Sequence, residues 1–239
     1  MSKRVIILAG GKGTRLKPYT VTLPKPLVPI GPYPVLEIII RQLVHYGFSR
    51  ATLTVNHQAD IIRAYFGDGS KWGINIDYSF ENKPMNTMGP LTLIKDLPEH
   101  FMVMNGDVLT DLDYADFFDY HCKRNNIFTI SGIRRSILNE FGVLEIGEEG
   151  YLEGFREKPE INFTVSMGIY MVSRKILEHI PKDTAYGFDH LMLKLLEIKK
   201  KVEVRTFSGY WLDIGRPEDY DTAVTEFEQN HDTFLPYDA

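Results

Sequence analysis

The sequence predicts an α/β fold, in which a mostly parallel sheet carries helices on both faces and a small antiparallel or mixed insertion. Three observations indicate it. Apolar strand-like segments alternate with helix-like segments over residues 1–133. A glycine-rich loop directly follows the first of these strands. After residue 140 the alternation gives way to short strands between turns. The first pattern is typical of βαβ units, whose parallel strands are buried on both sides.

The elements follow in order along the chain. Residues 34–47 have apolar positions at helical spacing and end at Gly47, which predicts a helix with a glycine C-cap. The other expected helices are 58–66, 114–124, 174–179, 187–198 and 217–229, and residues 230–239 read as a loose tail. Strands are expected at 3–9, 51–55, 74–80, 101–105 and 127–133, and an insertion over the sheet edge at 142–146, 151–155 and 165–172.

Composition limits the classes of function. The 239 residues are 44% hydrophobic, which is enough for one sizeable core, and the net charge of −5 argues against a nucleic-acid binder. No apolar stretch approaches the ~20 residues of a membrane span. Cys122 is the sole cysteine, so no internal disulfide forms, and together with the lack of a signal peptide this predicts a cytoplasmic protein. We expect one domain, 1–239, with halves 1–135 and 136–229.

The loop after the first strand predicts a polyphosphate site. It reads Leu8-Ala9-Gly10-Gly11-Lys12-Gly13-Thr14-Arg15-Leu16, and Pro24-Lys25-Pro26 follows. Glycines let backbone N–H groups approach an anion closely, and Arg15 and Lys25 add two cations. A P-loop is excluded, because Lys12 is followed by glycine and Ile6 stands where its first glycine is required. The dinucleotide fingerprint also fails, since Leu16 replaces its third glycine.

Two aspartates are candidates for a magnesium site. Asn105-Gly106-Asp107 follows an apolar strand, and ligands of α/β sheets bind beyond the carboxyl ends of the strands, so this motif and the glycine loop should open on one crevice. Asp213 follows Tyr210-Trp211-Leu212. Two carboxylates beside triphosphate oxygens are a typical Mg²⁺ environment. The alternative for each is a loop cap or a helix N-cap, and Asp213 does precede a helix start at Pro217.

These motifs resemble the signature of the sugar-1-phosphate nucleotidylyltransferases. The resemblance continues through Glu157-Lys158-Pro159 and Trp211-Leu212-Asp213-Ile214-Gly215, and so covers nearly the whole chain. It implies a Rossmann-like nucleotide-diphospho-sugar transferase fold and an enzyme that joins a nucleoside triphosphate to a sugar-1-phosphate, releasing pyrophosphate, in nucleotide-sugar and polysaccharide biosynthesis. No histidine pair with metal-ligand spacing and no G-x-S-x-G points to another chemistry.

The resemblance also assigns residues to roles. It implies catalytic roles for Arg15, Lys25 and Asp107, and Mg²⁺ ligands in Asp107 and Asp213. Sugar-phosphate contacts are expected from Gly142, Glu157, Lys158 and Ser166. Nucleotide contacts are expected from Leu8, Ala9, Gly10, Gly11, Gly13, Thr14, Arg15, Lys25, Glu81, Gly89 and Gly106.

The resemblance favours a guanylyltransferase that uses GTP and a mannose- or heptose-like 1-phosphate. A carboxylate at Glu81 can accept from two donors on the edge of guanine. Uridylyl, cytidylyl and thymidylyl transfer, a phosphocholine-like substrate, and a non-catalytic nucleotide-sugar-binding regulatory subunit stay open. Asn86, Met88 and Ser166 depart from the family pattern near the base and the sugar. Neither a nucleic-acid nor a membrane partner is expected, and a homodimer is left open.

Overall fold

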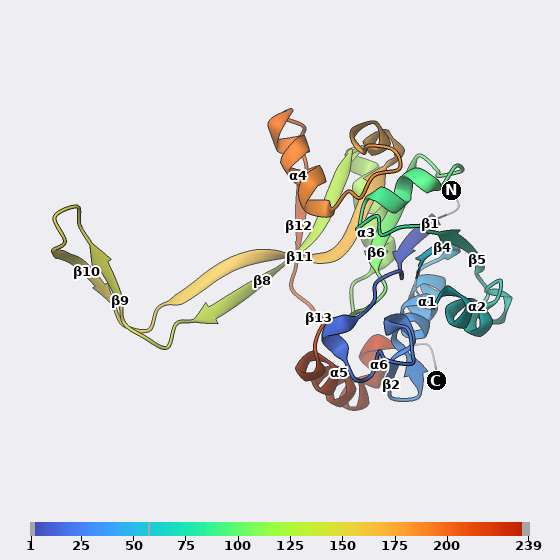
Figure 1. The fold of residues 1–239 in the computed structure, drawn as a ribbon, viewed down its shortest axis with the longest axis horizontal. Helices are drawn as coiled ribbons and strands as arrows, with labels where there is room; N and C mark the ends of the chain where they lie inside the picture. Colours follow the sequence, from blue (N-terminus) through green and yellow to red (C-terminus); the bar gives the residue numbers. More distant parts are fainter. Residues whose placement is uncertain (1–2, 57, 236–239) are drawn as a thin grey trace.

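A seven-stranded sheet forms the centre of the protein in the computed structural model, which describes residues 3–56 and 58–235 (Figure 1). The strand order is β12-β8-β11-β6-β1-β4-β5. Every neighbouring pair is parallel except the two pairs that β11 makes, with β6 and with β8. The predicted mostly parallel α/β fold is therefore confirmed. The strands are β1 (Lys3–Leu8), β4 (Phe48–Val55), β5 (Asn75–Phe80), β6 (His100–Asn105), β8 (Phe128–Leu138), β11 (Glu160–Ser173) and β12 (Glu203–Phe207).

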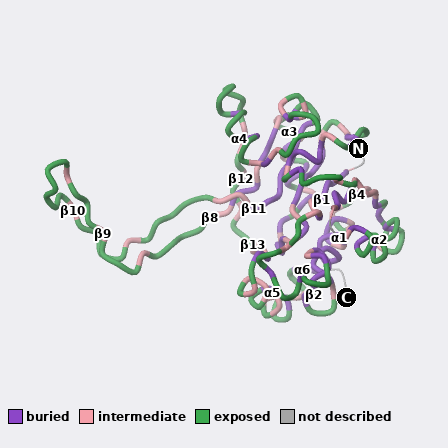
Figure 2. The backbone as a smooth tube through the Cα atoms, viewed as in Figure 1, coloured by how far each residue is buried: buried purple, intermediate pink, exposed green. Residues whose placement is uncertain are grey.

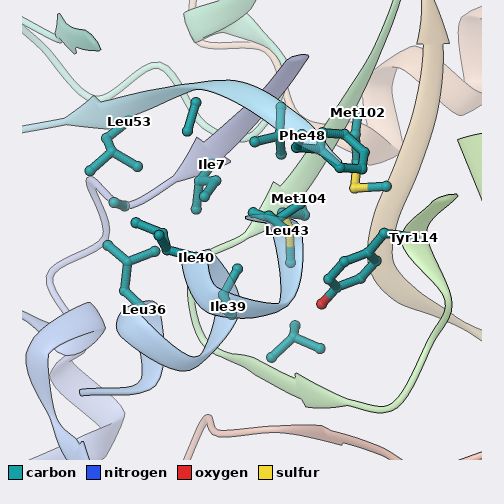
Figure 3. Packing of buried hydrophobic residues seen from close by; sticks show 14 of the residues in the cluster. Ile7, Leu36, Ile39, Ile40, Leu43, Phe48, Leu53, Met102, Met104 and Tyr114 are labelled. Atoms are coloured by element: carbon teal, nitrogen blue, oxygen red, sulfur yellow. The ribbon is translucent and has the colours of Figure 1, made fainter. Parts of the chain in front are cut away.

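Both faces of the sheet are covered, because consecutive residues of β1 point to opposite sides and residues 4–7 are all buried. Val5 and Ile7 belong to one apolar cluster and Ile6 to another. Figure 3 shows Ile7 packed beside the apolar stripe of α1 (Val35–His45). The second cluster includes Leu191 and Leu195 of α4 (Phe188–Glu197). The other helices are α2 (Ala59–Phe66), α3 (Tyr114–Arg124), α5 (Pro217–Gln229) and α6 (His231–Phe234). Among the described helices none is long and apolar enough to cross a membrane.

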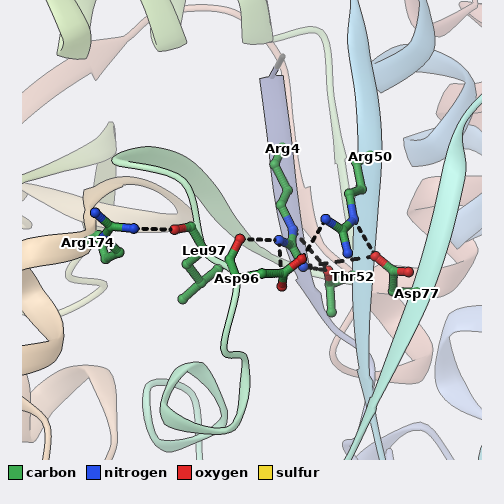
Figure 4. A network of polar contacts seen from close by, with 7 residues as sticks. All are labelled: Arg4, Arg50, Thr52, Asp77, Asp96, Leu97 and Arg174. Atoms are coloured by element: carbon green, nitrogen blue, oxygen red, sulfur yellow. Dashed lines mark hydrogen bonds and ion pairs between the residues drawn. The ribbon is translucent and has the colours of Figure 1, made fainter. Parts of the chain in front are cut away.

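A network of charged side chains ties the sheet together at the ends of β1 and β4 that lie away from the glycine loop (Figure 4). Arg4 is almost fully buried and donates to Thr52 Oγ1 and to the Asp96 carbonyl oxygen, at 2.8 Å each. Arg50 pairs with Asp77 and Asp96. Hydrogen bonding to Arg4 holds the pKa of Asp96 below its usual value. Because its charges are paired, we assign this cluster to structure.

The insertion after residue 133 differs from the expectation. It does not lie over the sheet edge: β8 and β11 continue past the sheet as a two-stranded ribbon, which ends in the hairpin of β9 (Val143–Ile146) and β10 (Leu152–Arg156) (Figure 1). We call residues 134–163 the arm. The physical reason is the ladder between β8 and β11, which runs without a register shift from the Gly132–Ser166 pair to the Leu138–Glu160 pair and keeps the ribbon extended.

The expectation of a loose tail at 230–239 was wrong for residues 231–235, while 236–239 lie outside the described residues. Residues His231–Phe234 form α6, and both Phe234 and Leu235 are buried in a third apolar cluster. Gln42 Nε2 also donates to the Phe234 carbonyl oxygen at 3.0 Å. The terminus is mostly polar in sequence, but these two apolar side chains anchor it. The free energy gained by burying them outweighs the conformational entropy that the chain loses on becoming ordered.

Candidate active site

The glycine loop leaves the end of β1 through a turn that glycine makes feasible. Gly13 has φ +59°, in the left-handed region, and a Cβ there would lie 2.9 Å from Thr20 Cγ2. Thr20 Oγ1 donates to the Gly13 carbonyl oxygen at 2.7 Å and fixes the turn. The short helix η1 (Thr14–Leu16) follows, with Leu16 fully buried as its anchor. This geometry holds Arg15 beside the loop.

A cavity of about 400 Å³ lies at the carboxyl ends of four adjacent strands. The glycine loop and the segment after β6 both open on it, as the strand arrangement predicted. The residues that line it are Leu8, Gly10, Gly11, Lys12, Thr54, Asn56, Glu81, Pro84, Met85, Asn86, Thr87, Asn105 and Asp107. The lining residues that were not predicted as site residues are Lys12, Thr54, Asn56, Pro84, Met85, Asn86, Thr87 and Asn105. The available signals were the position of Thr54, Asn56 and Asn105 at or next to strand ends and that of Lys12 in the glycine loop.

Glu81 forms one wall of this cavity, directly after β5. A Cβ on Gly10 would come within 3.0 Å of Glu81 Oε1, so the glycine makes room for the carboxylate. Burial raises the pKa of Glu81, and the Met85 N–H, donating to Oε2 at 3.2 Å, offsets part of that rise. Asn86 has φ +58° and adopts the backbone conformation for which asparagine is suited. The wall therefore presents an acceptor in a confined space.

Lys25 and Asp107 meet at the edge of the cavity. Lys25 lies in the turn η2 (Lys25–Leu27), and its Nζ contacts Asp107 Oδ2. Their side chains are only 12% and 18% exposed, so the ion pair is largely shielded from water. The other oxygen, Asp107 Oδ1, is buried and accepts no hydrogen bond from any described residue. A buried carboxylate oxygen without a donor is suited to a cation.

Asp213 is brought next to Asp107 by a small two-stranded ladder whose strands lie far apart in the sequence. Strand β13 (Trp211–Asp213) pairs with β7 (Val108–Thr110), which sets Asp213 opposite Val108. The Ile214 N–H donates to the Asp107 carbonyl oxygen at 3.0 Å. Burial, followed by the neighbouring Asp107 charge, raises the pKa of Asp213, whereas Lys25 and Arg15 act in the opposite direction. Four predicted residues, Arg15, Lys25, Asp107 and Asp213, therefore form one electrostatic cluster.

The N-cap alternative for Asp213 is excluded by the start of α5. Asp219 serves that end instead: its Oδ2 accepts from the backbone N–H of Arg216 at 2.9 Å and of Gly215 at 3.2 Å.

A second cavity of about 250 Å³ adjoins this cluster. It is lined by Arg15, Arg135, Trp211, Leu212, Asp213, Gly215, Arg216 and Asp219. Arg135 and Arg216 were not predicted. Arg216 directly follows the Trp211–Gly215 motif, which was a usable signal, whereas Arg135 belongs to the base of the arm and lies over the Trp211 ring at 6.0 Å, a position that the sequence does not reveal.

The predicted sugar-phosphate residues are not all brought to this cluster. Gly142, Glu157 and Lys158 lie on the arm, at the joint between the ribbon and the β9–β10 hairpin, far from the strand ends (Figure 1). Ser166 lies at the base of the arm, where its Oγ accepts from the Gly168 N–H at 3.2 Å. A Cβ on Gly168 would lie 2.6 Å from Asn105 Nδ2, so this base does border the cavity.

The remaining predicted nucleotide residues occupy supporting positions. Gly106 N donates to the Leu8 carbonyl oxygen at 3.1 Å, which holds the two strand ends together. Gly89 lies outside the cavity lining; a Cβ there would come within 2.6 Å of the Thr184 carbonyl oxygen, so close packing explains this glycine. Ala9 is buried and donates to the Thr54 carbonyl oxygen at 2.9 Å, and Thr14 is exposed at the start of η1.

Comparison with known proteins identifies the family. The profile described as Nucleotidyl transferase matches residues 4–230. The chain belongs to this family. It is 32% identical to a UTP–glucose-1-phosphate uridylyltransferase of Synechocystis sp., over 92% of this chain, and 30% identical to a mannose-1-phosphate guanylyltransferase of Mycobacterium tuberculosis, over 90%. It spans 62% of the length of each of these relatives.

Solved structures of family members have the same fold. HddC from Yersinia pseudotuberculosis is 30% identical, with a TM-score of 0.74, and the match covers 94% of this chain and 99% of HddC. A second structure of HddC, complexed with GMP-PN, matches with a TM-score of 0.71. The resemblance drawn from the motifs is thereby confirmed at the level of the family.

Proposed function

We propose that this protein transfers a nucleoside monophosphate from a nucleoside triphosphate to a sugar-1-phosphate, giving a nucleotide sugar and pyrophosphate. The single observation that carries the proposal is the cluster of Arg15, Lys25, Asp107 and Asp213 beside a cavity at the strand ends. Relatives named as guanylyl- and uridylyltransferases of sugar-1-phosphates support it.

The reaction requires positioning and cations rather than a general base. A phosphate monoester with a second pKa near ~6 is already mostly dianionic at pH 7 and can attack the α-phosphorus directly. The barrier lies in bringing two polyanions together and in stabilising the charge that develops. Lys25 would hold the transferring phosphate, and Arg15, beside the glycine loop, would neutralise the pyrophosphate that leaves.

Asp107 and Asp213 fit a divalent cation, for which we propose Mg²⁺. Magnesium is commonly held by one or two carboxylates, with phosphate oxygens and water completing the shell. The unpaired Asp107 Oδ1 satisfies that requirement, and within the described part of the chain no group of three or more His, Cys, Asp or Glu offers a denser site. When bound, the cation would offset the negative charge of the triphosphate. Lys25 would then release Asp107 Oδ2 and turn to the phosphate.

The base is proposed to be guanine and the sugar mannose- or heptose-like. The Glu81 carboxylate lines the cavity and can accept from N1–H and the exocyclic amine of guanine, a pair of donors that uracil does not offer. The relative HddC, whose structure with GMP-PN is known, is in keeping with this choice.

A matrix of four nucleoside triphosphates against several sugar-1-phosphates with Mg²⁺, read by pyrophosphate release, tests the proposal. We expect release with GTP and a mannose- or heptose-like 1-phosphate. Release with another base alone would correct the specificity. No release from any pair, with nucleotide-sugar binding retained, would instead identify a regulatory subunit.

A further inference from the structure

The arm has one apolar and one polar face, as its register dictates. In an antiparallel ribbon, paired residues share a face and successive pairs alternate. Ile133 pairs with Val165, Arg135 with Phe163 and Ile137 with Ile161, all on one face. The opposite face carries the alternate pairs, Gly132–Ser166, Arg134–Thr164, Ser136–Asn162 and Leu138–Glu160. Such alternation is the pattern of a sheet with one buried side.

The hairpin at the end of the arm repeats the pattern. Leu144 pairs with Phe155 and Ile146 with Leu152, whereas Glu145 and Arg156 on the other face form an ion pair at 3.0 Å. Ile133 packs against the core at the base, but from residue 134 to residue 163 the described side chains are mostly exposed, as Figure 2 shows. Apart from Leu138, which lies on the opposite face, nine large apolar side chains of the arm are between 37 and 76% exposed: Ile137, Phe141, Leu144, Ile146, Tyr151, Leu152, Phe155, Ile161 and Phe163.

An area of this size needs a partner. With aromatic side chains of 150–250 Å² among them, the nine residues leave on the order of 1,000 Å² of apolar surface, against about 800 Å² per partner in a standard stable interface. An isolated two-stranded ribbon is at best marginally stable, and exposed apolar patches this large mark an interaction surface. The arm therefore carries enough surface for one stable protein interface.

The arm cannot cover its own crevice without losing structure. Its ladder is continuous from Gly132 to Leu138, so bending it back would break strand pairs. Its base is also fixed: Trp211 Nε1 donates to the Met167 carbonyl oxygen at 2.8 Å, and Ser131 Oγ donates to that of Ile169 at 2.7 Å. The extended direction is the one that the hydrogen bonds favour.

A second copy of this chain offers a matching surface. The body carries an apolar cavity of about 390 Å³ lined by Leu23, Leu27, Pro34, Ile61, Ala64 and Tyr65. It adjoins η2, which holds Lys25, so an arm seated there comes close to the catalytic cluster of the other copy. Because each copy has one arm and one such cavity, a two-fold dimer satisfies both arms at once.

We propose that two copies exchange arms and that each arm completes the active site of the other copy. This inference rests on the proposed function. It gives Glu157 and Lys158 a route to a crevice that they do not reach in their own chain: the Lys158 ammonium would hold the sugar phosphate, and Glu157 would accept from sugar hydroxyls. Lys158 has φ +42°, which is rare for a residue with a side chain. This backbone conformation fixes the direction of the joint between the ribbon and the hairpin, where Glu157 and Lys158 lie.

Mixed dimers test the exchange. Chains with Lys158→Ala and chains with Asp107→Asn are co-expressed under different tags, and the species carrying both tags is purified. Each variant alone should lose at least 10²-fold in kcat/KM. In the mixed dimer one of the two sites combines an intact body with an intact arm, so we expect about half of the wild-type activity. The matched control pairs a wild-type chain with a chain carrying both substitutions, which should be almost inactive.

The opposite result, an inactive mixed dimer and a half-active control, would overturn the exchange and leave the proposed function standing. A wild-type protein that is monomeric at assay concentration but active would do the same. If the wild-type dimer itself releases no pyrophosphate, the proposed function fails. The exchange is then tested by the molecular mass in solution of the wild type and of an arm variant. Ile137→Ser with Ile161→Ser should convert dimer to monomer; a dimer that persists contradicts the assigned interface.

Discussion

Replacing Lys25 by methionine is the most direct test of the catalytic cluster. The substitution keeps the length of the side chain and removes its charge. In the protein without ligands Lys25 pairs with Asp107, and both side chains are less than a fifth exposed. Loss of the Lys25 ammonium leaves Asp107 Oδ2, like the buried Oδ1, without its donor. An unsatisfied buried polar group costs about 1–3 kcal/mol, which corresponds to a decrease in Tm of roughly 2–4 °C per kcal/mol in a chain of this size.

The effect on turnover should exceed the effect on stability. Loss of one preorganised charge in a water-poor site lowers kcat by about 10²-fold or more, equivalent to about 2.7 kcal/mol of transition-state stabilisation. The assay is pyrophosphate release at saturating substrates, with thermal unfolding measured in parallel. Lys25→Arg, which retains the charge, should recover part of the rate. Lys123→Met, at an exposed lysine on α3, is the matched control and should leave both quantities unchanged.

A second readout does not depend on turnover. The positive charge of Lys25 on Asp107 opposes the binding of a divalent cation to the same carboxylate, so Mg²⁺ should raise the Tm of Lys25→Met more than that of the wild type. The reasoning would be refuted by a variant whose kcat stays within threefold of wild type while its Tm falls, because Lys25 would then be a purely structural partner of Asp107.

Three further predictions follow from single residues. Gly13→Ala forces a left-handed conformation and a close contact with Thr20, so we expect a loss of about 1–2 kcal/mol in the free energy of unfolding; Gly11→Ala, in open space, should unfold like the wild type. Glu81→Gln should raise KM for GTP by about 10- to 100-fold, the value of one charged hydrogen bond, and leave UTP unaffected; an equal change for both nucleotides would contradict a contact with guanine. Burial lowers the pKa of His121 to about 4, below its unfolded value near 6.5. Between pH 6.5 and pH 4 the unfolded chain therefore binds more protons than the folded protein, so the free energy of unfolding decreases as the pH falls through this range. The decrease is on the order of 2 kcal/mol at pH 5. Denaturant titrations at pH 7 and pH 5 should show a smaller difference in the free energy of unfolding for His121→Asn than for the wild type.

Local sequence patterns were enough to predict the helices and strands whose apolar positions follow directly from which faces are buried. The run Val5-Ile6-Ile7 is apolar at every position because both of its faces are covered, and Gly47, at φ +77°, follows the end of α1 as a glycine C-cap predicts. The glycine loop and the Asn105–Asp107 segment are each contiguous in sequence, so their opening on one cavity followed from the rule that parallel strands present their carboxyl ends together.

The sequence by itself determined the sheet, the family and the residue types of the candidate site, because periodicity and short motifs are local properties. Only the tertiary structure decided which of those residues meet. Asp213 joins Asp107 through the pairing of β13 with β7, two three-residue strands too short to register as a pattern. It also decided the direction of the arm. The β8–β11 ladder continues past the sheet for five further residues of β8 and carries Glu157 and Lys158 away from Lys25. No local signal distinguishes a ribbon that folds back from one that extends. Strand pairing and packing between distant segments set both outcomes, since their free energy depends on partners that the local sequence does not name.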